Sequence, residues 1–142
     1  MRVLAIDPGT TESGWVLYDG SVIDSGVAQN EALIDQLAHE DADLMAVEMI
    51  ASYGMAVGRE VFETCVWIGR FIQASPIPHK LITRQKVKLH VCKSPKAKDA
   101  NIRQALIDKI GPVGTKKAPG PTYGVKSHAW AALAVAVTAS ET

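Results

Sequence analysis

The segment AIDPGTTESGWVLYDG, residues 5–20, constrains the fold more than any other part of the chain. Residues 3–6 form an apolar, partly β-branched run that predicts a strand, and this run ends on Asp7. Pro8 and Gly9 predict a turn, and residues 14–18 predict a second strand. A carboxylate at the end of a buried strand costs free energy unless a metal, a partner or a bound phosphate compensates its charge. An aspartate that only caps a turn is the alternative.

The rest of the chain predicts an α/β fold with a mixed five-stranded sheet. The strand before Asp7 and the strand of residues 44–47 both end on an acid, the second one on Glu48. Asp19 and Gly20 predict a tight hairpin between the second and third strands. The order of elements predicts one domain, residues 1–142, with helices on the faces of the sheet. The expected strands cover residues 2–7, 14–18, 21–28, 44–47 and 79–83, and the expected helices cover residues 31–39, 55–75, 97–110 and 127–138.

Three segments carry more specific expectations. The apolar stripe of residues 55–75 is wide enough for two buried faces, which is typical either of a homodimer seam or of a two-sided core helix. Residues 111–126 are rich in Gly, Pro and Lys and predict a mobile loop. Ser127 is the expected N-cap of the last helix.

The formal net charge of zero hides a strong asymmetry along the chain. Residues 1–79 hold three Lys or Arg against twelve Asp or Glu, whereas residues 80–126 hold twelve Lys or Arg against two acids. The basic part indicates a phosphate-rich partner such as nucleic acid, and a merely solvated lysine surface is the alternative. The chain has no apolar run of about 20 residues and no signal-peptide pattern, so we expect no membrane partner and a cytoplasmic location. Cys65 and Cys92 match no metal or disulfide spacing.

The two acids that follow strands predict a metal site. If their strands are central and parallel, Asp7 and Glu48 lie side by side at one edge of the sheet. Such a pair repels itself unless a divalent cation intervenes, and Mg²⁺ prefers oxygen ligands. Two ions about 3.5–4 Å apart can activate water and stabilise a leaving oxygen during phosphodiester hydrolysis. We therefore expect two Mg²⁺ ions, with Mn²⁺ as a substitute.

Three motifs in this order resemble one known family. The IDPGT…GW segment, the acid after the fourth strand and the closing SHAWAALAVAV resemble the RuvC-type Holliday-junction resolvases, which belong to the ribonuclease-H-like superfamily. The resemblance spans essentially the whole chain and implies a ribonuclease-H-like nuclease domain with helices on both faces of its sheet. It also implies a homodimer that cuts four-way DNA junctions. The short length resembles that of phage-encoded members, which would act in the host cytoplasm.

The resemblance assigns the catalytic residues, with one departure. It implies that Asp7, Glu48 and His128 bind metal, and it places a further family aspartate at Ala131, which cannot. Two explanations stay open for Ala131. Either an aspartate has been replaced there and the protein is inactive, or the site works with His128 alone and water completes the coordination. A solvent-facing histidine at a helix N-terminus is the alternative for His128.

The resemblance also implies contacts between the basic region and DNA. A family lysine that follows an Arg-Gln pair on the fifth strand, and another at the start of the next helix, would neutralise phosphates beside the cut. Tyr53 follows Glu48 closely and could stack on an unpaired base, or pack the N-terminus of the next helix instead. The candidate phosphate contacts are Arg84, Lys86, Lys88, Lys93, Lys96, Lys98, Arg103, Lys116, Lys117 and Lys126.

Other classes of protein share parts of this pattern. The actin and sugar-kinase ATPases also open with a strand, an Asp and a Gly-Thr turn, but they need a second lobe and a second phosphate loop that this chain does not supply. A branched-DNA- or RNA-binding protein without catalysis fits Ala131. A ribonuclease-H-like nuclease acting on structured RNA fits the same motifs, and the nature of the substrate separates it from a junction resolvase.

Overall fold

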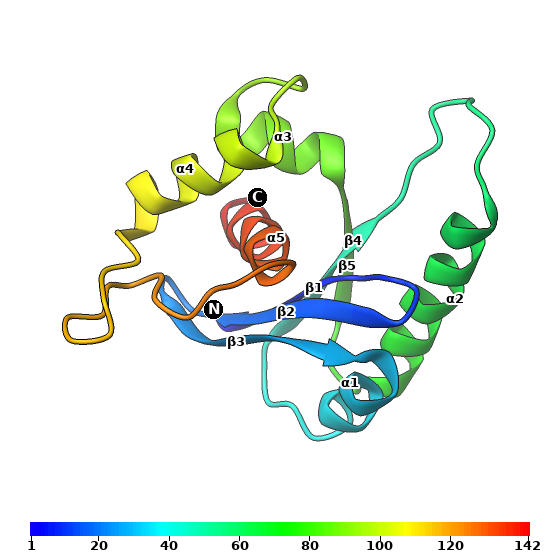
Figure 1. Ribbon diagram of the computed structural model, residues 1–142. Coiled ribbons are helices and arrows are strands. Elements are labelled where there is room, and N and C mark those ends of the chain that lie inside the picture. The colour runs from blue at the N-terminus through cyan, green and yellow to red at the C-terminus, as the bar shows by residue number, and fades with distance from the viewer.

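The computed structural model describes residues 1–142 and shows a five-stranded mixed sheet with the order β3-β2-β1-β4-β5 (Figure 1). Strands β1, β2 and β3 pair antiparallel, and β1, β4 and β5 pair parallel. The predicted α/β class with a mixed sheet is therefore confirmed. The strands are β1 (Val3–Asp7), β2 (Glu12–Tyr18), β3 (Val22–Gln29), β4 (Leu44–Met49) and β5 (His79–Thr83).

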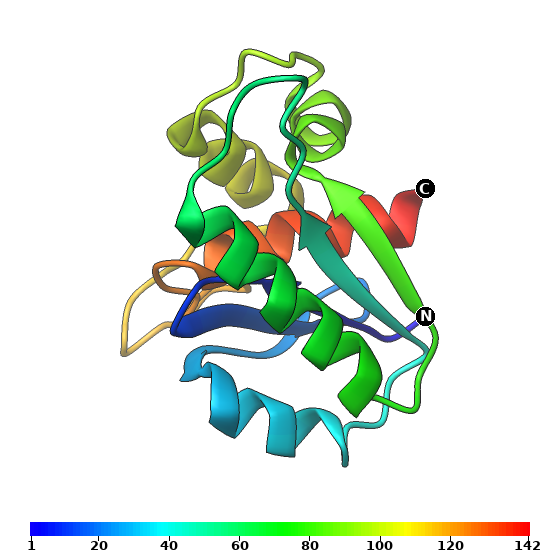
Figure 2. The same ribbon diagram turned by 90° about the vertical axis from the view of Figure 1, so that its right-hand side faces the viewer.

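Helices cover both faces of the sheet, as Figures 1 and 2 show. The helices α1 (Asn30–Leu37) and α2 (Arg59–Ala74) lie on one face, and α5 (Ala129–Glu141) lies on the other, beneath α3 (Arg84–Cys92) and α4 (Asp99–Ile110). A hydrophobic core lies on each face of the sheet. The side chains of β1 point alternately into one core and the other, because successive residues of a strand point to opposite faces. Leu4 and Ile6 pack with α1 and α2, whereas Val3 and Ala5 pack with α5.

The close contact between α5 and the sheet explains the alanine-rich sequence of that helix. Small side chains let the helix axis approach the strands, and residues 132–139 of α5 are all buried. Gly14 in β2 is part of the same contact: a Cβ atom there would lie 2.4 Å from the backbone carbonyl of His128. Any side chain at position 14 would therefore push away the start of α5.

Helix α3 was not predicted. The sequence after β5 alternates basic and apolar residues, which is the pattern of a strand, and the resemblance had placed its lysine on the fifth strand. The strand instead ends at Thr83, whose hydroxyl accepts a hydrogen bond from the backbone N–H of Lys86 (3.3 Å) and so caps a new helix. Val87 is buried against the core around α5.

Two helix starts were also predicted wrongly. Ser127 does not cap α5: its backbone is left-handed (φ 51°), and the helix begins at Ala129 with His128 at the N-cap. The helix expected from residue 55 begins at Arg59, because the backbone of Gly58 at the N-cap is extended (φ −92°, ψ −179°). Tyr53 (φ 52°) and Gly54 (φ 81°) make a turn before it. The loop of residues 50–58 extends beyond the end of β4 (Figure 1).

Helix α2 buries only one face in this chain. Thr64, Ile68 and Phe71 are buried against the sheet, whereas Phe62 and Val66 are 63% and 62% exposed. The alternative of a two-sided core helix is therefore wrong for the single chain. The hypothesis of a homodimer seam stays a prediction.

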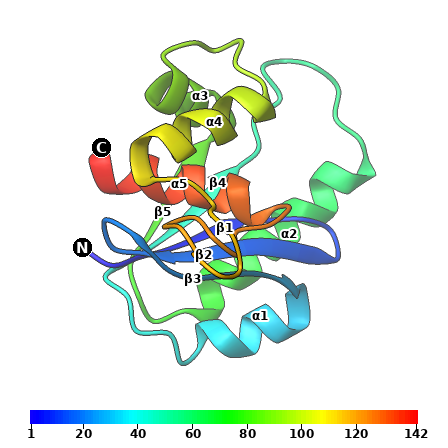
Figure 3. The same cartoon turned by 60° about the vertical axis from the view of Figure 1, so that its left-hand side comes forward.

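The Gly- and Pro-rich segment between α4 and α5 runs across the sheet as a folded-back loop (Figure 3). Hydrogen bonds hold it in place. Gly114 and Pro119 form a β-bridge, and the buried Thr122 donates its hydroxyl hydrogen to the carbonyl of Gly111 (2.9 Å). Val125 packs into the core around α5. Hydrogen bonds thus fix the base of this segment, and its tip is exposed. The mobility expected from its composition stays a prediction. None of the helices is both long and apolar enough to span a membrane.

Candidate active site

Asp7 and Glu48 lie together at the carboxyl ends of the two central parallel strands. Ile6 is paired with Val47 in the register of β1 and β4, which brings the residues that follow them to the same edge of the sheet. Both side chains are largely shielded from solvent, with 17% and 15% exposed. The geometry expected from the sequence, in which two strands deliver neighbouring acids, is present in the structure.

The surroundings of Asp7 and Glu48 disfavour the ionised form of both carboxyl groups. Burial raises the pKa of Asp7 although His128 and Arg84 lower it. Burial and then the negative charge of Asp7 raise the pKa of Glu48 to about 7, against the lowering effect of Arg84 and Lys88. Each carboxylate would be stabilised by a positive charge placed between them.

His128 contacts the first of these acids. Its Nδ1 lies 3.2 Å from Oδ2 of Asp7, while 59% of its side chain remains exposed. The close approach of β2 and α5 at Gly14 sets this position, because it brings the backbone of His128 down onto the sheet. The histidine is therefore neither buried nor turned away from the site, and its imidazole can orient the Asp7 carboxylate.

A buried polar pair that sequence reasoning missed holds the turn after Asp7. Ser13 donates its hydroxyl hydrogen to Oδ1 of Asn30 (2.6 Å) and accepts a hydrogen bond from the backbone N–H of Gly9 (3.1 Å). The amide of Asn30 donates to the carbonyl of Gly9 (2.9 Å). Ser13 and Asn30 are almost completely buried, so these bonds fix the turn and with it the direction of Asp7. The only local sign of this buried pair in the sequence is a serine at an inward-facing position of β2.

Basic side chains from α3 lie on the other side of Glu48. Nη1 of Arg84 is 4.0 Å from Oε1 of Glu48, and the same guanidinium forms an ion pair with Asp99 at the start of α4. A cavity of about 410 Å³ opens beside Glu48 and is lined by Arg84, Lys88 and Tyr53, among others. Of the candidate DNA contacts, these three are the ones that share a cavity with Glu48.

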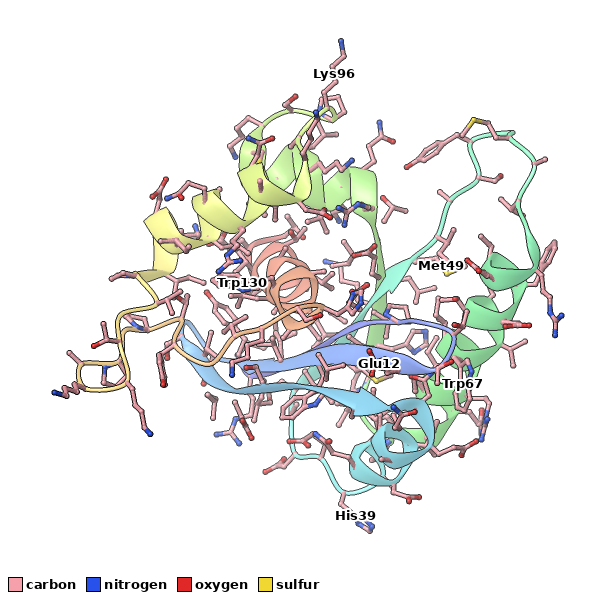
Figure 4. The ribbon with its side chains drawn as sticks, viewed as in Figure 1. Glu12, His39, Met49, Trp67, Lys96 and Trp130 are labelled. Carbon is pink, nitrogen blue, oxygen red and sulfur yellow. The ribbon has the colours of Figure 1, made fainter.

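The other candidate phosphate contacts are spread over the surface. Lys86 and Lys93 line a separate hollow with His90, and the Arg103 guanidinium lies over the ring of Trp130, 4.8 Å from its centroid. Figure 4 shows Lys96 at the tip of the α3–α4 turn, pointing away from the molecule. The remaining candidates are exposed: Lys98, Lys116, Lys117 and Lys126.

The residues present fit a magnesium site in part. No group of three or more His, Cys, Asp or Glu side chains is gathered closely enough to hold a metal ion by itself. Mg²⁺ is commonly bound through one or two carboxylates, with water and substrate phosphates as further ligands, and Asp7 and Glu48 meet that requirement. Ala131 adds no ligand from α5, so the two carboxylates alone suit one ion better than two.

Comparison with known proteins rests on structure, because no family model and no curated protein matches the sequence. Two solved structures of Thermus thermophilus RuvC cover 97% of this chain and 92% of their own, with a TM-score of 0.71. Their sequences are 20% and 19% identical to it, and the second structure holds a Holliday junction substrate. The chain has the RuvC fold. This fold is of the ribonuclease-H-like type, as the resemblance in the sequence implied.

Proposed function

We propose that this protein is a divalent-metal-dependent endonuclease that cuts four-way DNA junctions. The observation that carries the proposal is the pair of Asp7 and Glu48 at the ends of adjacent parallel strands, both with a raised pKa, within a RuvC fold. A bound cation would stabilise the ionised form of both carboxylates. RuvC from T. thermophilus has been solved with a Holliday junction, which supports the same class of substrate here.

In this proposal Asp7 and Glu48 hold Mg²⁺, or Mn²⁺ in its place. A divalent ion bound there supplies activation of water and stabilisation of the leaving oxygen. His128 orients the Asp7 carboxylate through its Nδ1 contact. Arg84 and Lys88 lie where they can neutralise a phosphate that enters the cavity beside Glu48. Two ions per site would need more carboxylate oxygens than Asp7 and Glu48 offer, which makes position 131 important.

The protein would act as a homodimer, because two symmetric cuts in a junction require two active sites. The exposed face of α2 supports a dimer. Its large apolar side chains Phe62 and Val66 are exposed to solvent in the single chain and would be buried in an interface. Tyr53, 64% exposed in the loop before α2, lies in the cavity beside Glu48 and is placed to stack on an unpaired base.

Cleavage assays test the proposal directly. Labelled four-way junction, linear duplex and RNA hairpin would be incubated with the protein in Mg²⁺ or in EDTA. We expect metal-dependent, symmetric cuts in the junction only, and Asp7→Asn should abolish cutting while junction binding is kept. Cutting that is unchanged in Asp7→Asn would contradict the assignment of the site. Preference for the RNA hairpin would indicate a structured-RNA nuclease instead.

A second candidate function follows from Ala131. With no carboxylate at this position, the chain could recognise branched DNA without cutting it. Ala131→Asp separates the two functions: if only the variant cuts the junction and the parent chain binds it, the parent is a non-catalytic junction-binding protein. If both the parent chain and Ala131→Asp cut the junction, the parent's own residues are sufficient for cleavage.

A further inference from the structure

The segment between α4 and α5 carries two adjacent lysines at the point where it folds back on itself. Thr115 and Ala118 exchange backbone hydrogen bonds, each N–H donating to the other residue's carbonyl (both 3.1 Å), so Lys116 and Lys117 are the two residues of the turn. The N–H of Ala118 also donates to the hydroxyl of Thr115 (3.1 Å). Both lysines are exposed, and the tip projects from the molecule (Figure 1).

No acid of the chain neutralises this tip. Residues 109–126 contain no Asp or Glu. Lys109 is paired with Glu141, whereas none of the ion pairs of the chain includes Lys116, Lys117 or Lys126. Neighbouring positive charges without a counter-ion repel each other and attract anions. The tip therefore fits a partner that carries negative charge.

The tip belongs to the basic part of the molecule. Val113 and Val125, on either side of the tip in sequence, pack into the core around α5, which lies on the same face of the sheet as α3 and α4. Residues 1–79, which include α1 and α2 on the opposite face, hold twelve acids against three Lys or Arg and would repel a polyanion.

The same segment leads from the tip to the candidate active site. The exposed Lys126 precedes His128 by two residues, and His128 contacts Asp7. Figure 1 shows the tip on the opposite side of the molecule from α2, and Figure 2 shows it at the end of the sheet where the turn after β1 lies. A duplex that runs from the cavity beside Glu48 away from α2 would cross the start of α5 and then reach the tip.

We infer that Lys116 and Lys117 bind backbone phosphates of one duplex arm of the junction, at a distance from the point of cleavage. This inference rests on the proposed function, because it concerns the same DNA. It adds a second area of contact, separate from the cavity that Arg84 and Lys88 line.

Junction binding in EDTA tests the inference without metal and without cutting. The affinity for a labelled four-way junction would be measured by fluorescence anisotropy at several salt concentrations. The slope of log K against log salt is about −0.9 for each phosphate contact, so Lys116→Ala/Lys117→Ala should reduce its magnitude by about 2. The same double variant should bind on the order of tenfold more weakly at about 0.1 M salt.

The matched control is Arg2→Ala/Lys80→Ala. It removes the same charge near the amino ends of β1 and β5, away from Asp7 and Glu48, and should keep the parent's affinity and salt slope. Neither lysine of the tip has a positive φ, so alanine fits the turn and both double variants should keep the parent's melting temperature.

The length of the junction arms separates a contact with an arm from a contact at the point of cleavage. As the arms are shortened, the parent's affinity should fall to that of Lys116→Ala/Lys117→Ala once the arms no longer reach the tip. The inference alone is overturned if this variant binds long-armed junctions like the parent, if its loss is equally large with the shortest arms, or if the control variant loses as much. Absence of DNA binding by the parent would overturn the proposed function as well.

Discussion

Replacing Glu48 by glutamine should make the metal-free protein more stable at alkaline pH. In the folded chain, burial and the charge of Asp7 raise the pKa of Glu48 from 4.5 to about 7. Between pH 4.5 and pH 7 the folded state keeps a proton that the unfolded state has released. The free energy of unfolding therefore falls as the pH rises through this window and stays low above it.

The size of the effect follows from the difference between the two pKa values. At about 1.36 kcal/mol for each pKa unit, the change from 4.5 to about 7 corresponds to about 3 kcal/mol as an upper limit. Glutamine has nearly the same shape as glutamate and carries no charge. Glu48→Gln should therefore be more stable than the parent at pH 8 by up to this amount, and the two proteins should differ little near pH 4.5.

Urea denaturation in EDTA at pH 5 and pH 8, followed by tryptophan fluorescence, measures this difference. Glu60→Gln on the exposed side of α2 is the matched control and should keep the parent's pH dependence. Asp7, whose pKa is also raised by burial, leaves a slope of the same sign in every protein. Equal pH dependence in Glu48→Gln and the parent, or a variant that is less stable at pH 8, would refute the reasoning. Mg²⁺ should stabilise the parent at pH 8 more than it stabilises Glu48→Gln.

Three further substitutions test the fold, the assembly and the DNA contacts. Gly14→Ala should lower the free energy of unfolding by about 1–3 kcal/mol, because its methyl group would clash with the start of α5. Gly69→Ala is the control, because a methyl group there meets no other atom, and it should not destabilise the protein. Equal stability of both variants in urea would contradict the close approach of β2 and α5. Phe62→Glu should convert a dimer to a monomer in light scattering, and a parent that is already monomeric would contradict the α2 seam. Lys88→Ala should weaken junction binding in a filter or gel assay more than Lys86→Ala does, because only Lys88 lies beside Glu48, and the reverse order would contradict the proposed DNA path.

The parts of the fold that could be predicted depend on local signals. The hairpin at Asp19 and Gly20 forms as expected, with Gly20 at φ 72°, because the turn needs a residue that tolerates this conformation. The two strands that carry Asp7 and Glu48 near their carboxyl ends were visible because apolar runs and these acids are adjacent in sequence. Their parallel pairing then brings the acids together without any further information from side chains.

The parts that could not be predicted depend on contacts between distant residues. The alternation of Val87, Leu89 and Val91 with polar residues resembles a strand, but the cap at Thr83 and the burial of Val87 favour a helix. The Ser13–Asn30 bond joins positions 17 residues apart, and neither residue forms a motif alone. Such pairs can be found only once the strands and helices are placed against one another.

Under the proposed function, the charges around the carboxylates let a metal take the place of protein cations at this edge of the sheet. Without metal, the positive charge facing Glu48 comes from Arg84 and Lys88 of α3, and both lower its pKa against burial. These groups are long, partly exposed side chains, and nucleic-acid phosphates attract the same groups. DNA that enters the cavity would draw positive charge away from Glu48 and leave the two acids repelling each other. Under the proposed function a divalent ion would remove this repulsion, so we expect metal and DNA to bind together more tightly than either one alone.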